Sequence, residues 1–304
     1  MRFLSIGVNE YTNDSIDYLV NQLNDLKEKK LKLKTTLIKF SKSRVIICKL
    51  NENRILSALS DHNFNILKQY ASFILSDYII KYYEKKLITR IVNMNYCYFN
   101  QAEKKQIVDL STSILKSGEN SKISLYSTKR KNLIFRKLLE YFENSNEIIL
   151  DGFVNFRIKE YIRELEDVVD KAVDTFLMER EYQEFIKLLR YFVDIQEPKL
   201  EAVHILPGYE NKYIILDHSH NEITNDCIKE FLNEVPEEDI NFDDLLVSSL
   251  ITIAPIRIYI HDAKQIKNKE LIETIKNVFL NKVILCNGCD LCKVHRVSIE
   301  TLTK

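Results

Sequence analysis

The sequence predicts a helix-rich α+β protein, and three observations support that prediction. The 304-residue chain holds only 5 glycines and 4 prolines, so long helices and few long loops are expected. Residues 151–199 place apolar side chains three or four positions apart, which is the spacing of one buried helix face. Both ends of the chain instead carry short runs of β-branched residues bounded by turn residues, a pattern that is typical of strands.

The first 52 residues are predicted to form a β-α-β-β unit. Residues 1–8 form the first expected strand, and the polar side chains of residues 12–15 offer a cap for the helix that follows. Two further strands, at 36–40 and 44–50, are separated by a short polar turn and are expected to pair as a hairpin.

Residues 53–199 are predicted to be mainly helical. Helices are expected at 55–59, 64–86, 88–98, 103–115 and 133–142, with short extended pieces at 123–126 and 147–150. Two amphipathic helices between residues 153 and 197 then follow, separated by a short break. The first is expected to bury Ile158, Tyr161, Ile162, Leu165, Val168, Val169, Ala172, Val173 and Phe176. The second is expected to stop at Pro198 and to bury Tyr182, Phe185, Ile186, Leu189, Phe192 and Val193.

Residues 200–304 are predicted to form an α/β module. A hairpin is expected from strands at 202–206 and 213–217, followed by helices at 222–234 and 242–253 after Asn241. A strand at 256–260, a helix at 269–280 and a strand at 283–286 complete the alternation. The predicted domains are therefore 1–52, 53–199 and 200–304, with one compact body as the alternative.

The charge of the chain is unevenly distributed. Residues 1–150 hold 25 Lys/Arg against 15 Asp/Glu, a net +10, and the remainder is −10 because the whole chain is neutral. The basic half, with lysines between 27 and 34 and a second group at 129–137, makes nucleic-acid binding a less favoured alternative. Helix C-termini also favour lysine, and no helix-turn-helix, RNA-recognition or OB-fold signature is present.

The sequence also indicates where in the cell the protein is expected to reside. No secretory signal is visible at the N-terminus. The most apolar window, 246–260, is interrupted by Pro255 and Arg257 and is shorter than the ~20 residues of a membrane helix. With six cysteines and no secretion signal, reduced thiols and a cytoplasmic location without a membrane span are expected.

The strongest local signal for chemistry is the run Cys286, Cys289, Cys292 and His295. Thiols three apart can converge on one ion, and Gly288 permits the tight turn that this needs. Three thiolates and an imidazole are a plausible tetrahedral Zn²⁺ set. An iron–sulfur cluster is the less favoured metal, because a fourth cysteine and its following proline are missing. The alternative is three reduced cysteines without a ligand.

A weaker metal candidate is the pair His218 and His220. In an extended chain the two imidazoles would point to the same face. No third ligand is identifiable, although His261 and Asp262 also lie at the end of a predicted strand. The favoured alternative is a polar turn before a helix.

Residues 153–199, FVNFRIKEYIRELEDVVDKAVDTFLMEREYQEFIKLLRYFVDIQEPK, resemble the signature segment of the YtxC-like family of sporulation proteins. HILPGY and IAPIRIYIH, further along the chain, look similar too. The resemblance implies a sporulation-linked protein of endospore-forming bacteria, with no established activity, cofactor or active site. No phosphate-binding loop, dinucleotide fingerprint, nucleophile elbow or H-E-x-x-H motif is present. The predicted function is therefore non-enzymatic action through an unknown protein partner, with metal binding as the alternative.

Overall fold

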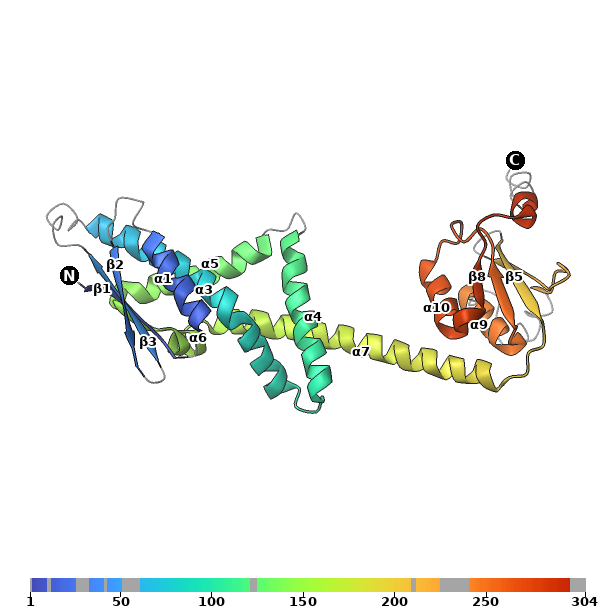
Figure 1. The fold of residues 1–304 in the computed structure, drawn as a ribbon, viewed down its shortest axis with the longest axis horizontal. Coiled ribbons are helices and arrows are strands. Elements are labelled where there is room, and N and C mark those ends of the chain that lie inside the picture. Colours follow the sequence, from blue (N-terminus) through green and yellow to red (C-terminus); the bar gives the residue numbers. More distant parts are fainter. Residues whose placement is uncertain are drawn as a thin grey trace. The chain divides into compact units, whose positions relative to one another are not determined.

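The computed structural model describes residues 2–9, 12–25, 33–40, 43–50, 61–120, 125–208, 212–224 and 241–295. The chain forms two compact units, Met1–Met178 (unit 1) and Glu179–Lys304 (unit 2), whose elements are labelled in Figure 1. The helix-rich α+β class is confirmed, whereas the three-part division of the chain stays a prediction.

Unit 1 holds a four-stranded sheet in the order β2-β3-β1-β4. Its strands are β1 (Arg2–Val8), β2 (Leu33–Lys39), β3 (Arg44–Leu50) and β4 (Glu147–Ile149). The first three are antiparallel neighbours, and β4 runs parallel to β1. With α1 (Asn13–Asp25) between β1 and β2, the predicted β-α-β-β unit is confirmed. The Thr12 hydroxyl accepts a hydrogen bond from the Ser15 N–H, so the predicted polar cap also forms.

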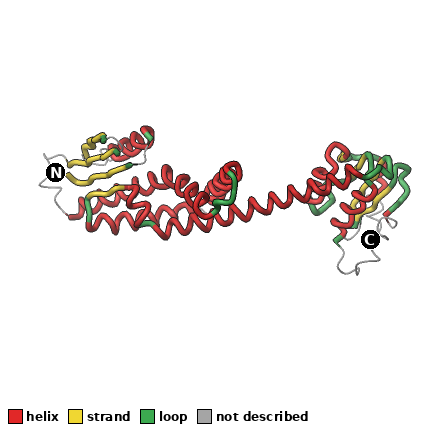
Figure 2. The backbone as a smooth tube through the Cα atoms, turned by 90° about the horizontal axis from the view of Figure 1, so that it is seen from below, coloured by secondary structure: helices red, strands yellow, loops and turns green. Residues whose placement is uncertain are grey.

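Helices pack on this sheet and, together with α1 and the helix that begins at Lys159, make the core of unit 1 (Figure 2). Alternate sheet residues such as Ile6 and Ile46 are fully buried among the side chains of these helices. The other helices of this unit between β3 and residue 156 are α3 (Asp61–Asn95), α4 (Gln101–Asn120), α5 (Leu125–Asn144) and α6 (Leu150–Phe156). The two helices expected at 64–86 and 88–98 are one helix, α3. Leu125 begins α5, so the extended piece expected at 123–126 is wrong where it is described, and the helix expected at 55–59 lies outside the described residues.

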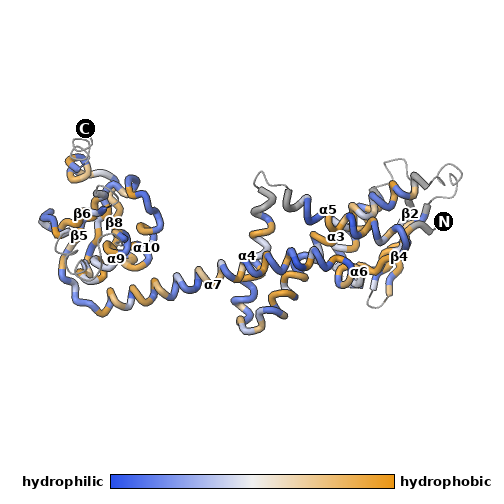
Figure 3. Tube along the Cα trace, turned by 180° about the vertical axis from the view of Figure 1, so that it is seen from behind, coloured by the Kyte–Doolittle hydropathy of each residue, from blue (hydrophilic) through white to orange (hydrophobic). Residues whose placement is uncertain are grey.

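The most consequential difference from the prediction is α7 (Lys159–Ile195), a single helix of 37 residues. The expected break is wrong, because residues 176–181 hold no glycine, proline or other helix-breaking residue. Figure 3 shows hydrophobic and hydrophilic segments alternating along the helix. Up to Phe176 its apolar stripe lies in the core of unit 1, and from Tyr182 onward it packs on the core of unit 2. The helix ends before Pro198, as predicted.

Two side chains that were expected to be buried on α7 are exposed instead. Phe185 is 53% exposed and Phe192 is 41% exposed. The side chains that reach the core of unit 2 follow steps of four, three and four along the helix, and both phenylalanines fall outside this series. The members of the series are Tyr182, Ile186, Leu189 and Val193.

Unit 2 is an α/β module around a second four-stranded sheet, in the order β6-β5-β7-β8. The strands are β5 (Ala202–Pro207), β6 (Tyr213–Leu216), β7 (Arg257–Ile260) and β8 (Val283–Leu285). β5 and β6 pair as the predicted antiparallel hairpin, and β5, β7 and β8 are parallel. Because they are parallel, their carboxyl ends meet at one edge of the sheet, where open α/β sheets place ligands.

Two capped helices pack on the second sheet. They are α9 (Phe242–Ile253) and α10 (Lys269–Phe279), which a short 3-10 helix, η5 (Leu280–Lys282), follows. Asn241 caps α9, as predicted, and Asn268 caps α10 through its side-chain oxygen. The helix expected at 222–234 lies largely outside the described residues. Among the described helices, none combines the length and the apolar character that crossing a membrane would need.

Candidate metal centre

Backbone pairing places one histidine and one cysteine at neighbouring strand ends in unit 2. His261 directly follows β7, and its N–H donates to the Ile205 carbonyl at 2.8 Å. Cys286 directly follows β8, and its N–H donates to the Ile260 carbonyl at 2.9 Å. The two residues therefore continue the parallel ladder at the carboxyl edge of the sheet, although they are distant in sequence.

The chain then turns back and brings two more thiols to the same place. Gly288 has φ of +126°, a backbone conformation that L side chains rarely adopt, and it lies between Cys286 and Cys289. Residues 290–295 are helical, and the Lys293 N–H donates to the Cys289 carbonyl at 3.2 Å. Cys289 and Cys292 are three residues apart on this turn, so they face the same side.

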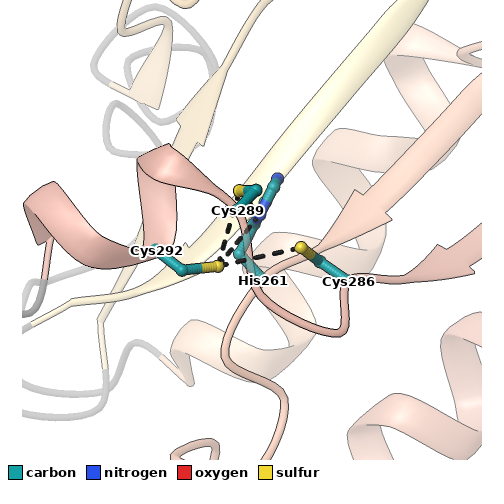
Figure 4. Close-up of side chains that lie close together, drawn as sticks. All are labelled: His261, Cys286, Cys289 and Cys292. Atoms are coloured by element: carbon teal, nitrogen blue, oxygen red, sulfur yellow. Dashed lines mark hydrogen bonds between the residues drawn. The ribbon is translucent and has the colours of Figure 1, made fainter.

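The donor atoms of His261, Cys286, Cys289 and Cys292 all lie within 4.8 Å of one another. Figure 4 shows the four side chains pointing toward a common centre. Sγ of Cys292 lies 3.8 Å from Sγ of Cys286 and 3.7 Å from Sγ of Cys289. His261 Nδ1 lies 3.4 Å from the sulfurs of both Cys289 and Cys292.

These separations match those around a tetrahedral zinc ion. With Zn–S of about 2.3 Å and Zn–N of about 2.0–2.1 Å, a regular tetrahedron has S···S edges of about 3.8 Å and S···N edges of about 3.6 Å. The four side chains of this centre could therefore hold a metal ion with little rearrangement.

The surroundings lower the pKa values of His261 and Cys289 and raise that of Cys292. Burial lowers the pKa of His261, although the nearby Asp262 carboxylate opposes that effect, so the ring favours the neutral form. Burial raises the pKa of Cys292 to about 11. Burial acts on Cys289 in the same sense, but hydrogen bonds from the Cys292 backbone and the neighbouring thiols hold its pKa below the ordinary value. The Gly288 N–H also donates to the Cys286 sulfur at 3.4 Å.

Three of the four residues predicted from the cysteine run come together here, and the fourth does not join them. His295 lies on the terminal helical turn outside this group, with its Nδ1 buried and without a hydrogen-bond partner among the described residues. Its role as a metal ligand stays a prediction. His261 takes the fourth place in the group, and sequence reasoning considered it only as a partner for His218 and His220.

The extended geometry considered for His218 and His220 is absent, and the favoured alternative, a polar turn, forms in its place. Residues 217–221 form a turn, in which the Asp217 carboxylate accepts hydrogen bonds from the N–H groups of Ser219 and Asn221 at 2.8 and 2.9 Å. His220 has φ of 65° and packs its ring edge against His204, with centroids 4.9 Å apart. The two imidazoles are thus placed by a tight turn and not by a strand.

The basic residues around position 130 are engaged in ion pairs within unit 1. Lys129 pairs with Glu164 at 3.5 Å, Arg130 with Glu84 at 2.8 Å and Lys131 with Asp77 at 2.6 Å. Arg130 is buried, so its charge serves the fold of this unit.

Comparisons with known proteins place the chain in a family. Residues 69–284, more than half of the sequence, match the model described as the YtxC-like family. The chain belongs to the YtxC-like family. It is similar to "Uncharacterized protein YtxC" of Bacillus subtilis (strain 168), with 27% identity over 224 residues that cover 71% of this chain and 76% of that protein. No solved structure matches.

The family match confirms the resemblance noted from residues 153–199. It also divides the candidate metal centre, because the match ends at residue 284, directly before β8 ends. His261 lies inside the matched region, and the three cysteines lie beyond it. Support for the metal centre therefore comes from this chain's own residues and not from the family.

Proposed function

We propose that unit 2 of this YtxC-like protein binds one Zn²⁺ ion through Nδ1 of His261 and the thiolates of Cys286, Cys289 and Cys292. The observation that carries the proposal is the geometry of the donor atoms, whose S···S separations of 3.7 and 3.8 Å equal the edges of a zinc tetrahedron. Three of the donors come from a short run and the fourth from a separate strand, which fits a site built by the fold.

The donor set favours zinc over other metals. Soft thiolates with one imidazole in tetrahedral geometry suit zinc, whereas calcium and magnesium prefer oxygen ligands. A four-iron cluster ordinarily takes four cysteines, and the fourth donor here is an imidazole. Four protein ligands also fill the coordination sphere and leave no position for a substrate, so the proposed role is structural.

The structural consequence is a link between the end of β7 and the segment that follows β8. Bound zinc would tie residues 286–292 to the carboxyl edge of the sheet, where His261 lies. Binding of this kind contributes directly to folding, because the ligands converge only in the folded state.

Metal analysis of protein purified without oxygen tests the proposal. We expect about one equivalent of zinc, and we expect the Cys289→Ser, Cys292→Ser double variant to lose it, because four ligands complete a structural site. Cys97→Ser is the matched control, since Cys97 is an exposed free thiol of unit 1, and it should keep the full zinc content. Wild-type protein with less than roughly a tenth of an equivalent of zinc, or with iron in its place, would contradict a zinc site.

We propose further that the protein acts during sporulation through contacts with another protein. Support for this second proposal comes from the resemblance of residues 153–199 to the YtxC-like family and from the missing catalytic motifs. In an endospore-forming host, deletion of the gene should lower the yield of heat-resistant spores, and the wild-type gene should restore it. An unchanged spore yield after deletion would contradict the sporulation role without bearing on zinc.

A further inference from the structure

A second imidazole lies directly behind the metal centre. His204, on β5, has its Nδ1 atom 3.0 Å from Nε2 of His261. The other nitrogen of the His261 ring, Nδ1, lies 3.4 Å from two of the thiol sulfurs. The two nitrogens of one ring are therefore engaged on opposite sides, one by the thiol cluster and one by His204.

The chemistry of a neutral imidazole fixes the proton arrangement of this pair. A metal ion on Nδ1 of His261 uses the lone pair of that atom, so the ring proton must reside on Nε2. Nε2–H then donates to Nδ1 of His204, which must offer a lone pair and carry its own proton on Nε2. One tautomer of each ring satisfies this arrangement.

The ring of His204 is held in place by its neighbours. It stacks on the Tyr259 ring with centroids 4.8 Å apart and an interplanar angle of 10°. His204 and Tyr259 are also register partners in the parallel pair of β5 and β7. On another side the edge contact with His220 limits rotation of the ring. Its Nδ1 atom is thus a pre-positioned acceptor for the His261 ring.

We propose that His204 is a positioning residue, which accepts the hydrogen bond of His261 Nε2–H and so directs His261 Nδ1 at the metal. The inference rests on the proposed zinc site and adds a residue that the cysteine run does not contain. Hydrogen-bond partners of this kind set the orientation and basicity of a metal-bound histidine, and removing one usually costs about 10–100-fold in metal affinity.

Competition with a chromophoric zinc chelator tests this role in two variants. His204→Leu removes the acceptor, and we expect zinc affinity to fall by about 10–100-fold. His204→Asn places a carbonyl oxygen near the former Nδ1 position, and we expect it to keep most of the affinity. The unfolding midpoint of each metal-free variant serves as a control for a general loss of stability.

A tautomer measurement keeps the proposal testable even if His204→Leu does not fold. In the zinc-bound wild type, long-range ¹H–¹⁵N spectra should show the His261 proton on Nε2 and the metal on Nδ1. A wild-type protein that binds no zinc would contradict the zinc site itself. Zinc binding with His261 ligating through Nε2, unchanged affinity in His204→Leu, or equal losses in both variants would overturn the positioning role alone.

Discussion

Removing the proposed zinc ion with a chelator is expected to destabilise unit 2 by about 4 kcal/mol or more and to leave unit 1 unchanged. A ligand that binds only the folded state, at a free concentration of about 1,000 times its dissociation constant, stabilises that state by about 4.1 kcal/mol. The apparent binding free energy of structural zinc sites is commonly larger than this value. The effect should be local, because all four ligands lie in unit 2.

Hydrogen exchange followed by mass spectrometry can measure this effect segment by segment. After chelation, peptides that cover β7, β8 and residues 286–295 should lose protection, while peptides from α3 and α5 should not. A variant with serine at positions 286, 289 and 292 is the matched control, since chelator should not alter its exchange. Equal protection of residues 257–295 with and without metal would show that the metal does not hold this part of the fold.

Replacing Arg130 by methionine is expected to lower the free energy of unfolding of unit 1 by about 3–5 kcal/mol, because it breaks a largely buried ion pair by removing one partner. Arg130 pairs with Glu84 at 2.8 Å, and the two side chains are only 6% and 15% exposed. The Tyr161 hydroxyl also donates to the Glu84 carboxylate. Burial, together with the charge of Glu84, holds the pKa of Tyr161 well above its ordinary value, so this hydroxyl stays a donor.

Lys85, the residue directly after Glu84, offers a matched control for this ion pair. Lys85 pairs with Asp109 at 3.4 Å, but its side chain is 67% exposed. Lys85→Met should therefore cost at most about 1 kcal/mol, since exposed pairs are screened by water. Urea unfolding monitored by a probe in unit 1 compares the two variants. If both changes had similarly small effects, the buried pair would not be a major source of stability.

Sequence patterns predicted most elements whose signals are local. The hairpin of β5 and β6, the cap at Asn241 and the β-α-β-β unit all depend on residues close together in the chain, and all are present. A break was expected within residues 153–197, but α7 is continuous, and its buried positions pass from the core of unit 1 to the core of unit 2 between Phe176 and Tyr182. A change in which side of the helix carries the apolar residues does not by itself distinguish a broken helix from a continuous one.

The candidate metal centre shows the same limit of local patterns. Cys286, Cys289 and Cys292 were predicted from their spacing, and the structure brings their sulfurs together. His261 was not assigned to them, because it reaches the cluster only through the parallel pairing of β7 and β8. His295 was chosen because it continues the spacing of the cysteines. A polar residue directly after a strand was the one available signal for His261.

X-ray absorption at the zinc edge of the purified protein is the most direct test of the metal centre. The spectrum should fit about three sulfur ligands at about 2.3 Å and one nitrogen at about 2.0–2.1 Å. Two or fewer sulfur ligands, a shell made mainly of nitrogen and oxygen, or no zinc absorption at all would contradict a site built from His261 and the three cysteines.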